Sequence, residues 1–248
     1  MKNPQTGWYF LGLVILLFVG FFTYTKHLED TKVAYAADAI QERLLGLVET
    51  LKAYGVSDSR VLAAMGKIRR HEFIPTAFLD IFTAYGDHPC PIGYGQTISQ
   101  PYIVAYMTEK MNPQPGEKIL EIGTGSGYQA AVLAELGAEV YSVEIIPELA
   151  RHASEVLKNQ GCNVRVKAGD GYQGWAEHAP FDVVLVTCAP EAIPEALVEQ
   201  LKDGGRMILP VGSSGSQRLV IARKTAGRTA VEDDLPVRFV PMVPGSER

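Results

Sequence analysis

The feature that most constrains the fold is a glycine-rich turn between a strand-like run and a helix-like run. Residues Lys118–Ile122 form a short apolar run typical of a buried strand, and Tyr128–Leu136 is an apolar run of helical length. Gly123, Gly125 and Gly127 lie between them. Open α/β sheets bind ligands where such a turn follows the carboxyl end of a strand. We therefore expect a ligand site at this turn.

The rest of the chain repeats the same strand–turn–helix order. Further strands are predicted at Glu139–Glu144, from Val164, at Phe181–Thr187 and at Arg206–Pro210, helices at Pro147–Asn159 and Ile193–Leu201, and late antiparallel strands at Gln217–Lys224 and Val237–Val243. Alternation of this kind is typical of a parallel sheet covered by helices on both faces. The sequence thus predicts one doubly wound, mostly parallel α/β domain over residues 38–248.

Upstream of the sheet, the pattern predicts a helical N-terminal extension followed by a long loop-rich stretch. Helical spacing runs from Asp38 to Tyr54, where Gly55 ends it, and a second helical run opens at Ser57 and ends near Ile68. Prolines and glycines then interrupt residues 69–101. A loop of this length inside a compact domain is usually functional.

The first thirty residues form a separate segment. No charged side chain occurs from Asn3 to Thr25, and residues 8–22 are apolar or glycine throughout. This length lies between that of a signal peptide and that of a membrane span. We expect residues 1–30 to be an uncleaved membrane anchor. The alternatives are a secretory signal cleaved near Ala34-Tyr35-Ala36, and a buried core helix.

Charge and cysteine content exclude several classes of partner. The 23 basic and 28 acidic residues give a net charge of −5, and no Lys/Arg tract exceeds two residues. Such a chain is not built to bind nucleic acid phosphates. Cys90, Cys162 and Cys188 lie far apart without metal-ligand spacing, so we expect neither a disulfide framework nor a metal site.

The glycine turn differs from a dinucleotide-binding turn. Tyr128 occupies the position where the last glycine of GxGxxG would stand, and Glu121 ends the strand before the turn. A carboxylate there would repel a pyrophosphate but suits a ligand with positive charge. S-adenosylmethionine carries a sulfonium and an ammonium group and no phosphate, so it fits. We predict that the donor contacts Glu121, Gly123, Thr124, Gly125 and Gly127.

Acidic side chains at the ends of the next two strands support this prediction. Glu144 closes the second strand, 23 residues after Glu121, where a carboxylate can accept hydrogen bonds from both ribose hydroxyls. Asp170 and Gly171 follow the third strand at the same edge, where Asp170 is placed to bond an adenine amino group. Three carboxylates around one glycine turn favour a methyltransferase that uses S-adenosylmethionine.

Two segments resemble a specific family. Pro91–Pro101, which includes Gln-Thr-Ile-Ser-Gln-Pro, and Leu120–Gln129 are similar to the protein-L-isoaspartate O-methyltransferases. Further matches lie at Arg70–Pro75, Gly169–Trp175, Ala179–Asp182, Leu209–Gly212 and Val237–Pro241. The resemblance covers about residues 38–243. It implies a Rossmann-like class I methyltransferase fold and methylation of the free carboxylate of isoaspartyl residues in damaged proteins, which then return to aspartate through a succinimide.

The resemblance also implies roles for individual residues. Ser99 corresponds to the family's active-site residue, and we expect it to orient the acceptor by hydrogen bonding rather than act as a nucleophile. The acceptor carboxylate is already ionised at pH 7, so no strong general base is needed. Thr97 beside Ser99, Ile92 and Gly93 in the preceding loop, and Val240 near the C-terminus are predicted to bind the peptide.

Other readings of the same residues remain open. The domain could methylate small molecules, or it could be a membrane-tethered module that binds the donor without turnover, and a nicotinamide dehydrogenase is disfavoured by Tyr128. His88 and Cys90 are interpreted as packed or solvated side chains. We expect a monomeric catalytic domain that faces the cytoplasm, where the donor is made. Export to the periplasm after signal cleavage is the alternative.

Overall fold

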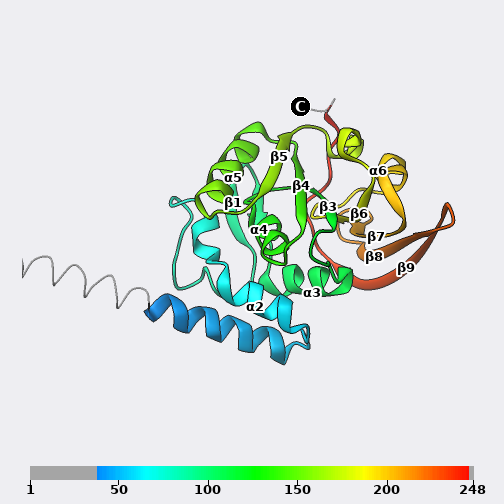
Figure 1. Cartoon of the computed structure of the whole chain (residues 1–248). Coiled ribbons are helices and arrows are strands. Elements are labelled where there is room, and N and C mark those ends of the chain that lie inside the picture. Colours follow the sequence, from blue (N-terminus) through cyan, green and yellow to red (C-terminus); the bar gives the residue numbers. More distant parts are fainter. Residues whose placement is uncertain (1–37, 246–248) are drawn as a thin grey trace, which may run out of the picture. The chain divides into compact units, whose positions relative to one another are not determined.

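The computed structural model describes residues 38–245 (Figure 1). The chain divides between Leu45 and Gly46 into two compact units, and of the first unit the structure describes the helical residues 38–45. The second unit contains the sheet. Within residues 38–245, no helix combines the length and the apolarity needed to cross a membrane. The predicted anchor at residues 1–30 lies outside the described residues.

A seven-stranded sheet forms the centre of the second unit (Figure 1). Its strands in spatial order are β5 (Val164–Ala168), β4 (Glu139–Glu144), β3 (Lys118–Ile122), β6 (Phe181–Val186), β7 (Leu201–Val211), β8 (Gln217–Thr225) and β9 (Arg228–Val237). The first five strands are parallel, and β8 and β9 pair in antiparallel fashion. The predicted mostly parallel sheet is confirmed.

The order of the strands places helices on both faces. Helices α4 (Tyr128–Glu135) and α5 (Pro147–Asn159) connect β3 to β4 and β4 to β5, which moves the chain one way along the sheet. Helix α6 (Glu195–Gln200) connects β6 to β7 in the other direction. Because such crossovers are right-handed, α6 lies on the opposite face from α4 and α5. The direction reverses between β3 and β6, so a ligand crevice is expected at the carboxyl ends of these two strands.

The central strands are apolar on both faces, as parallel strands between two helical layers must be. One face packs through alternating buried residues of β3, β4, β6, β7 and β8: Leu120, Ile122, Tyr141, Val143, Val184, Val186, Met207, Leu209, Val220 and Ala222. Glu121, Ser142 and Glu144 interrupt this apolar pattern although all three are buried. Polar groups in such a core need partners: Ser142 bonds Glu121, and Glu144 bonds the backbone of Gly125 and Ile146.

The loop-rich stretch before the sheet contains more regular structure than the sequence predicts. A short helical turn, η1 (Arg70–Phe73), precedes a hairpin of β1 (Cys90–Gly93) and β2 (Gln96–Ile98), and α3 (Pro101–Met111) follows. Proline and glycine interrupt the alternation of apolar and polar residues, so strands this short are not recognised from the sequence pattern. The preceding helix α2 (Ser59–Lys67) begins after Asp58, whose carboxylate accepts from the backbone N–H of Arg60, rather than at Ser57.

The predicted strand at Val237–Val243 is wrong. The last strand is β9, which ends at Val237, and most of its residues are exposed. An edge strand pairs on one side only and tolerates charged residues, so its sequence resembles that of a polar loop. The apolar residues that follow instead cross the end of the sheet, where Ala189 accepts from the N–H of Met242 and donates to the carbonyl of Val240, both at 2.8 Å.

Arg206 of β7 connects the sheet to the end of α3. Its guanidinium donates to Glu117 at 2.7 and 3.0 Å and to the carbonyls of Met111 and Asn112. The Arg206 and Glu117 side chains are only 15% and 21% exposed.

Arg206→Met should therefore lower the free energy of unfolding by about 1.5–3 kcal/mol, measured by urea denaturation. The matched variant Arg223→Met, at an exposed position of β8, should stay near wild type, and equal losses in both would contradict this role.

Candidate functional site

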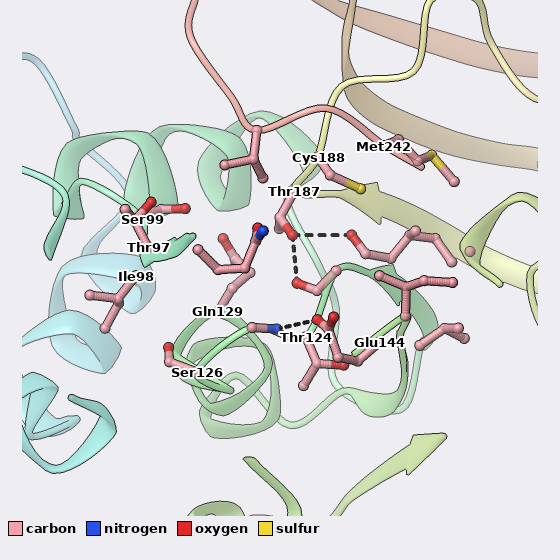
Figure 2. A pocket seen from close by; sticks show the side chains of 18 of the residues that line it. Thr97, Ile98, Ser99, Thr124, Ser126, Gln129, Glu144, Thr187, Cys188 and Met242 are labelled. Atoms are coloured by element: carbon pink, nitrogen blue, oxygen red, sulfur yellow. Dashed lines mark hydrogen bonds between the residues drawn. The ribbon is translucent and has the colours of Figure 1, made fainter. Parts of the chain in front are cut away.

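A cleft lies at the carboxyl ends of β3, β4 and β6 (Figure 2). It is open to solvent and is lined by both polar and apolar side chains. Its lining includes the residues Gln96–Ser99, Ile122–Ser126, Gln129, Glu144, Gly171, Thr187, Cys188 and Val240–Val243. We call this space the donor cleft. Figure 2 shows Thr97 and Ser99 on one side of it and Thr124 and Glu144 on the other. The site lies where the strand order predicts it.

The glycines of the turn have positive φ angles, which residues with a side chain rarely adopt. Gly123 has a φ of +94°, and a Cβ at this position would overlap the hydroxyl of Thr187. That hydroxyl also bonds the Gly123 carbonyl at 2.5 Å (Figure 2). Glycine is therefore required both by the conformation and by the close approach of β6. The turn thus exposes its backbone to the cleft.

Glu121 lies beneath the turn instead of in the cleft. It is fully buried and is not among the cleft-lining residues. One carboxyl oxygen accepts a short hydrogen bond from Ser142, whose hydroxyl also bonds Thr124 at 2.6 Å, and the other oxygen has no partner. Loss of solvation raises the pKa of Glu121 to about 8, with a further contribution from the charge of Glu144. Glu121 therefore supports the turn and holds a proton at neutral pH.

Glu144 faces the cleft and fixes the turn at the same time. Its two carboxylate oxygens accept from the N–H groups of Gly125 at 2.8 Å and of Ile146 at 2.9 Å. Each oxygen can still accept a second hydrogen bond. The side chain is nearly buried yet lines the cavity. It can therefore accept from two hydroxyls of a bound ligand without moving.

Asp170, predicted to bond the adenine amino group, bonds the protein backbone in the structure. Its carboxylate accepts from the N–H of Tyr172 at 2.9 Å and from the N–H of Gly245 at 3.1 Å, and it does not line the cleft. It thereby fastens the C-terminal segment to the end of β5. The neighbouring Gly171 does line the cleft, and a side chain there would collide with Ile122.

Gly127, also predicted to contact the donor, is the residue just before α4 and does not line the cleft. It has a φ of +88°, and a Cβ there would lie 3.2 Å from Leu157 and 3.4 Å from Ala153 of α5. Its small size therefore allows α4 and α5 to pack closely.

A second cavity adjoins the donor cleft. This acceptor groove is lined by Pro89, Gln100, Ile103, Ser214 and the residues 236–239, and it shares Thr97, Ser99, Thr187, Val240 and Pro241 with the donor cleft. Ser99 and Thr97 thus lie on the wall between the two spaces. The described lining of the groove contains Arg238 and no acidic residue, which suits an anionic acceptor.

Two of the residues predicted to bind the peptide lie outside both cavities. Ile92 is 2% exposed and packs beneath Gly125, and Gly93, with a φ of +94°, lies against the Phe78 ring. Thr97 and Val240 do line both spaces. Sequence reasoning missed Thr187, although it stands at the end of the predicted fourth strand, at the same sheet edge as Glu121 and Glu144.

The electrostatics of the donor cleft fit a cationic ligand. Among its described lining residues, Glu144 is the one carboxylate, and there is no lysine or arginine. The cleft thus offers no positively charged side chain to a diphosphate, whereas the Glu144 carboxylate can attract a sulfonium. Cys188 also lines the cleft, and burial, with the negative charge of Glu144, raises the pKa of its thiol. It is therefore no thiolate nucleophile, and the residues fit S-adenosylmethionine.

Comparisons with known proteins agree with this geometry. The family model of protein-L-isoaspartate(D-aspartate) O-methyltransferase matches residues 42–247. A protein-L-isoaspartate O-methyltransferase of Gloeobacter violaceus is 55% identical over 78% of this chain and 95% of its own, and one of Opitutus terrae is 48% identical over 92% and 94%. The solved structure of the Plasmodium falciparum enzyme in complex with S-adenosyl-L-homocysteine superposes with a TM-score of 0.71 and 25% identity, covering 80% of this chain and 97% of that one.

The raised pKa of Glu121 predicts a pH-dependent stability. Between its ordinary value of 4.5 and the value of about 8 in the fold, the unfolded chain loses this proton while the folded chain keeps it. The contribution of Glu121 to the free energy of unfolding is therefore fully present below pH 4.5. It falls as the pH rises toward 8, by about 1.4 kcal/mol for each pH unit between the two pKa values. Glu121→Gln removes this term, so the Tm of the variant relative to wild type should rise from pH 5 to pH 8. A constant difference across this range would show that Glu121 is ionised in the fold.

Proposed function

The chain belongs to the protein-L-isoaspartate(D-aspartate) O-methyltransferase family, and from this premise we propose how its two cavities divide the reaction. The activity is the transfer of a methyl group from S-adenosyl-L-methionine to the carboxylate of isoaspartyl residues in proteins. The resulting ester collapses to a succinimide, which allows the backbone to return to aspartate. The observation that carries our proposal is that the donor cleft and the acceptor groove meet at Ser99.

The donor cleft holds the cofactor by backbone and carboxylate contacts. The backbone of Gly123 and Gly125 lines the space next to β3, Glu144 accepts from the ribose hydroxyls, and the bare backbone of Gly171 leaves room for the base. When bound, S-adenosylmethionine supplies an electrophilic methyl group on a positively charged sulfur. Asp170 can contribute to the adenine site only through the oxygen lone pairs that Tyr172 and Gly245 leave free.

The acceptor groove presents the substrate carboxylate to the donor cleft. An isoaspartyl carboxylate is ionised at neutral pH and is itself the nucleophile, so the protein needs to hold one of its oxygens in line rather than to remove a proton. Ser99 and Thr97 provide hydroxyl donors on the shared wall, and Val240 faces the same space. Correct positioning alone can account for roughly 7–11 kcal/mol of the barrier. One copy of the domain suffices, because a single chain forms both cavities.

A pair of peptides tests the proposed acceptor. A peptide with one L-isoaspartyl residue should accept a methyl group, and its twin with ordinary aspartate at the same position should not, because only the former places its carboxylate at Ser99. The measurement is transfer of label from S-adenosylmethionine, together with release of S-adenosylhomocysteine. Equal methylation of both peptides, or of a small carboxylic acid in preference to either, would contradict protein repair. Absence of any product would favour a binding module without turnover.

Two variants separate the roles of the cavities. Ser99→Ala should lower kcat with the isoaspartyl peptide at least ten-fold and leave the donor Kd unchanged, because the hydroxyl touches the acceptor. Glu144→Ala should weaken donor binding by about 1.5–3 kcal/mol, measured by calorimetry with S-adenosylhomocysteine. Each variant is the control for the other. An unchanged kcat in Ser99→Ala would refute the orienting role.

We also propose that residues 1–30 anchor the protein in a membrane with the catalytic domain on the cytoplasmic side. The uncharged stretch from Asn3 to Thr25 supports the anchor, and the cytoplasmic supply of the donor supports the orientation. The native protein should resist carbonate extraction from membranes and retain its first residues in N-terminal mass spectrometry. A soluble form that begins just after Ala36 would instead support cleavage and export.

A further inference from the structure

Arg70 is an unusual residue within the described part of the chain, because its charge is fully buried without an acidic partner. It begins η1 and has no exposed surface. None of the ion pairs found among residues 38–245 includes Arg70. Burial of an unpaired guanidinium costs several kcal/mol unless its N–H groups are well bonded. The Nε of Arg70 has no hydrogen-bond partner in the described part of the chain, so this cost is offset by the contacts of its two terminal nitrogens.

The hydrogen bonds of the Arg70 guanidinium all go to the segment that leads to Ser99. One terminal nitrogen donates to the carbonyl of Ala84 and lies 3.7 Å from the sulfur of Cys90. The other donates to the carbonyls of His88 at 3.0 Å and of Ser99 at 3.2 Å. A single planar group thus joins the beginning of the segment 84–99 to its end. Lysine could not do this, because it lacks the rigid fork of donors.

The same guanidinium also borders the donor side. Its central carbon lies 6.0 Å from the centre of the Tyr128 ring. Tyr128 is the first residue of α4 and lines the donor cleft. Arg70 therefore touches the backbone of the acceptor wall and lies near a residue of the donor wall, although it lines neither cavity.

Ser99 needs such support, because it lies between two regular elements. Strand β2 ends at Ile98, and α3 begins at Pro101. A shift of about 1 Å in a positioning group can reduce a rate a hundred-fold. We infer that Arg70 is a positioning residue that sets the place of Ser99 by holding its carbonyl. This inference rests on the role proposed above for Ser99.

The inference is tested with Arg70→Lys, which keeps the charge and loses the fork. We expect kcat with the isoaspartyl peptide to fall at least ten-fold, while the Kd for S-adenosylhomocysteine stays within two-fold of wild type. Arg69→Lys is the matched control, because Arg69 is the exposed neighbour, and it should keep full activity. If wild type itself fails to methylate the peptide, the proposed function fails; if wild type is active and Arg70→Lys is equally active, only this inference fails.

A double variant separates positioning from general support of the fold. If Arg70 acts through Ser99, adding Arg70→Lys to Ser99→Ala should lower kcat by no more than two-fold further. If the kcat of the double variant falls by the product of the two single-variant losses, the inference is overturned. It is also overturned if the Kd for the donor rises in parallel with the fall in kcat.

A measurement on the unmutated protein covers the case in which Arg70→Lys does not fold. With ¹⁵N-labelled arginine, the buried Arg70 side chain should give slowly exchanging N–H signals. These signals should shift when the isoaspartyl peptide is added to the complex with S-adenosylhomocysteine, and the aspartyl twin should leave them unchanged. If the Arg70 signals do not shift on addition of the isoaspartyl peptide, the inference is overturned.

Discussion

The hydrogen bond from the Gly125 N–H to Glu144 is the interaction on which the site depends, because it joins the turn after β3 to the end of β4. Beneath it, Thr124, Ser142 and Glu121 form a buried polar chain that links the same two strands. The turn is therefore shaped before any ligand arrives. A preorganised backbone of this kind spends no binding energy on ordering itself.

Local sequence was enough to predict the parts of this arrangement that depend on neighbouring residues. Strands β3 and β4 and helix α5 were predicted within their observed bounds, because buried parallel strands are short apolar runs and Pro147 starts a helix. Glu144 was identified as a site residue because strand ends share one edge of the sheet. These predictions required no knowledge of distant contacts.

The remaining parts depend on distant contacts, and the sequence did not reveal them. Glu121 has the same chemistry as Glu144, but it is fully buried and bonded to Ser142, and burial raises its pKa to about 8. Asp170 bonds a residue 75 positions later in the chain. Arg70 meets Ser99 across 29 positions. The resemblance to a family pointed to the segments of Arg70 and Ser99, and the position of Asp170 after the third strand pointed to Asp170, but neither revealed these contacts.

The C-terminal segment shows why the end of the chain belongs to the site although it forms no strand of the sheet. Ala189 bonds the backbone on either side of Pro241, and Asp170 holds Gly245. The residues between these attachments line the donor cleft, and Val240 and Pro241 also line the acceptor groove. This segment therefore forms a wall that the two cavities share.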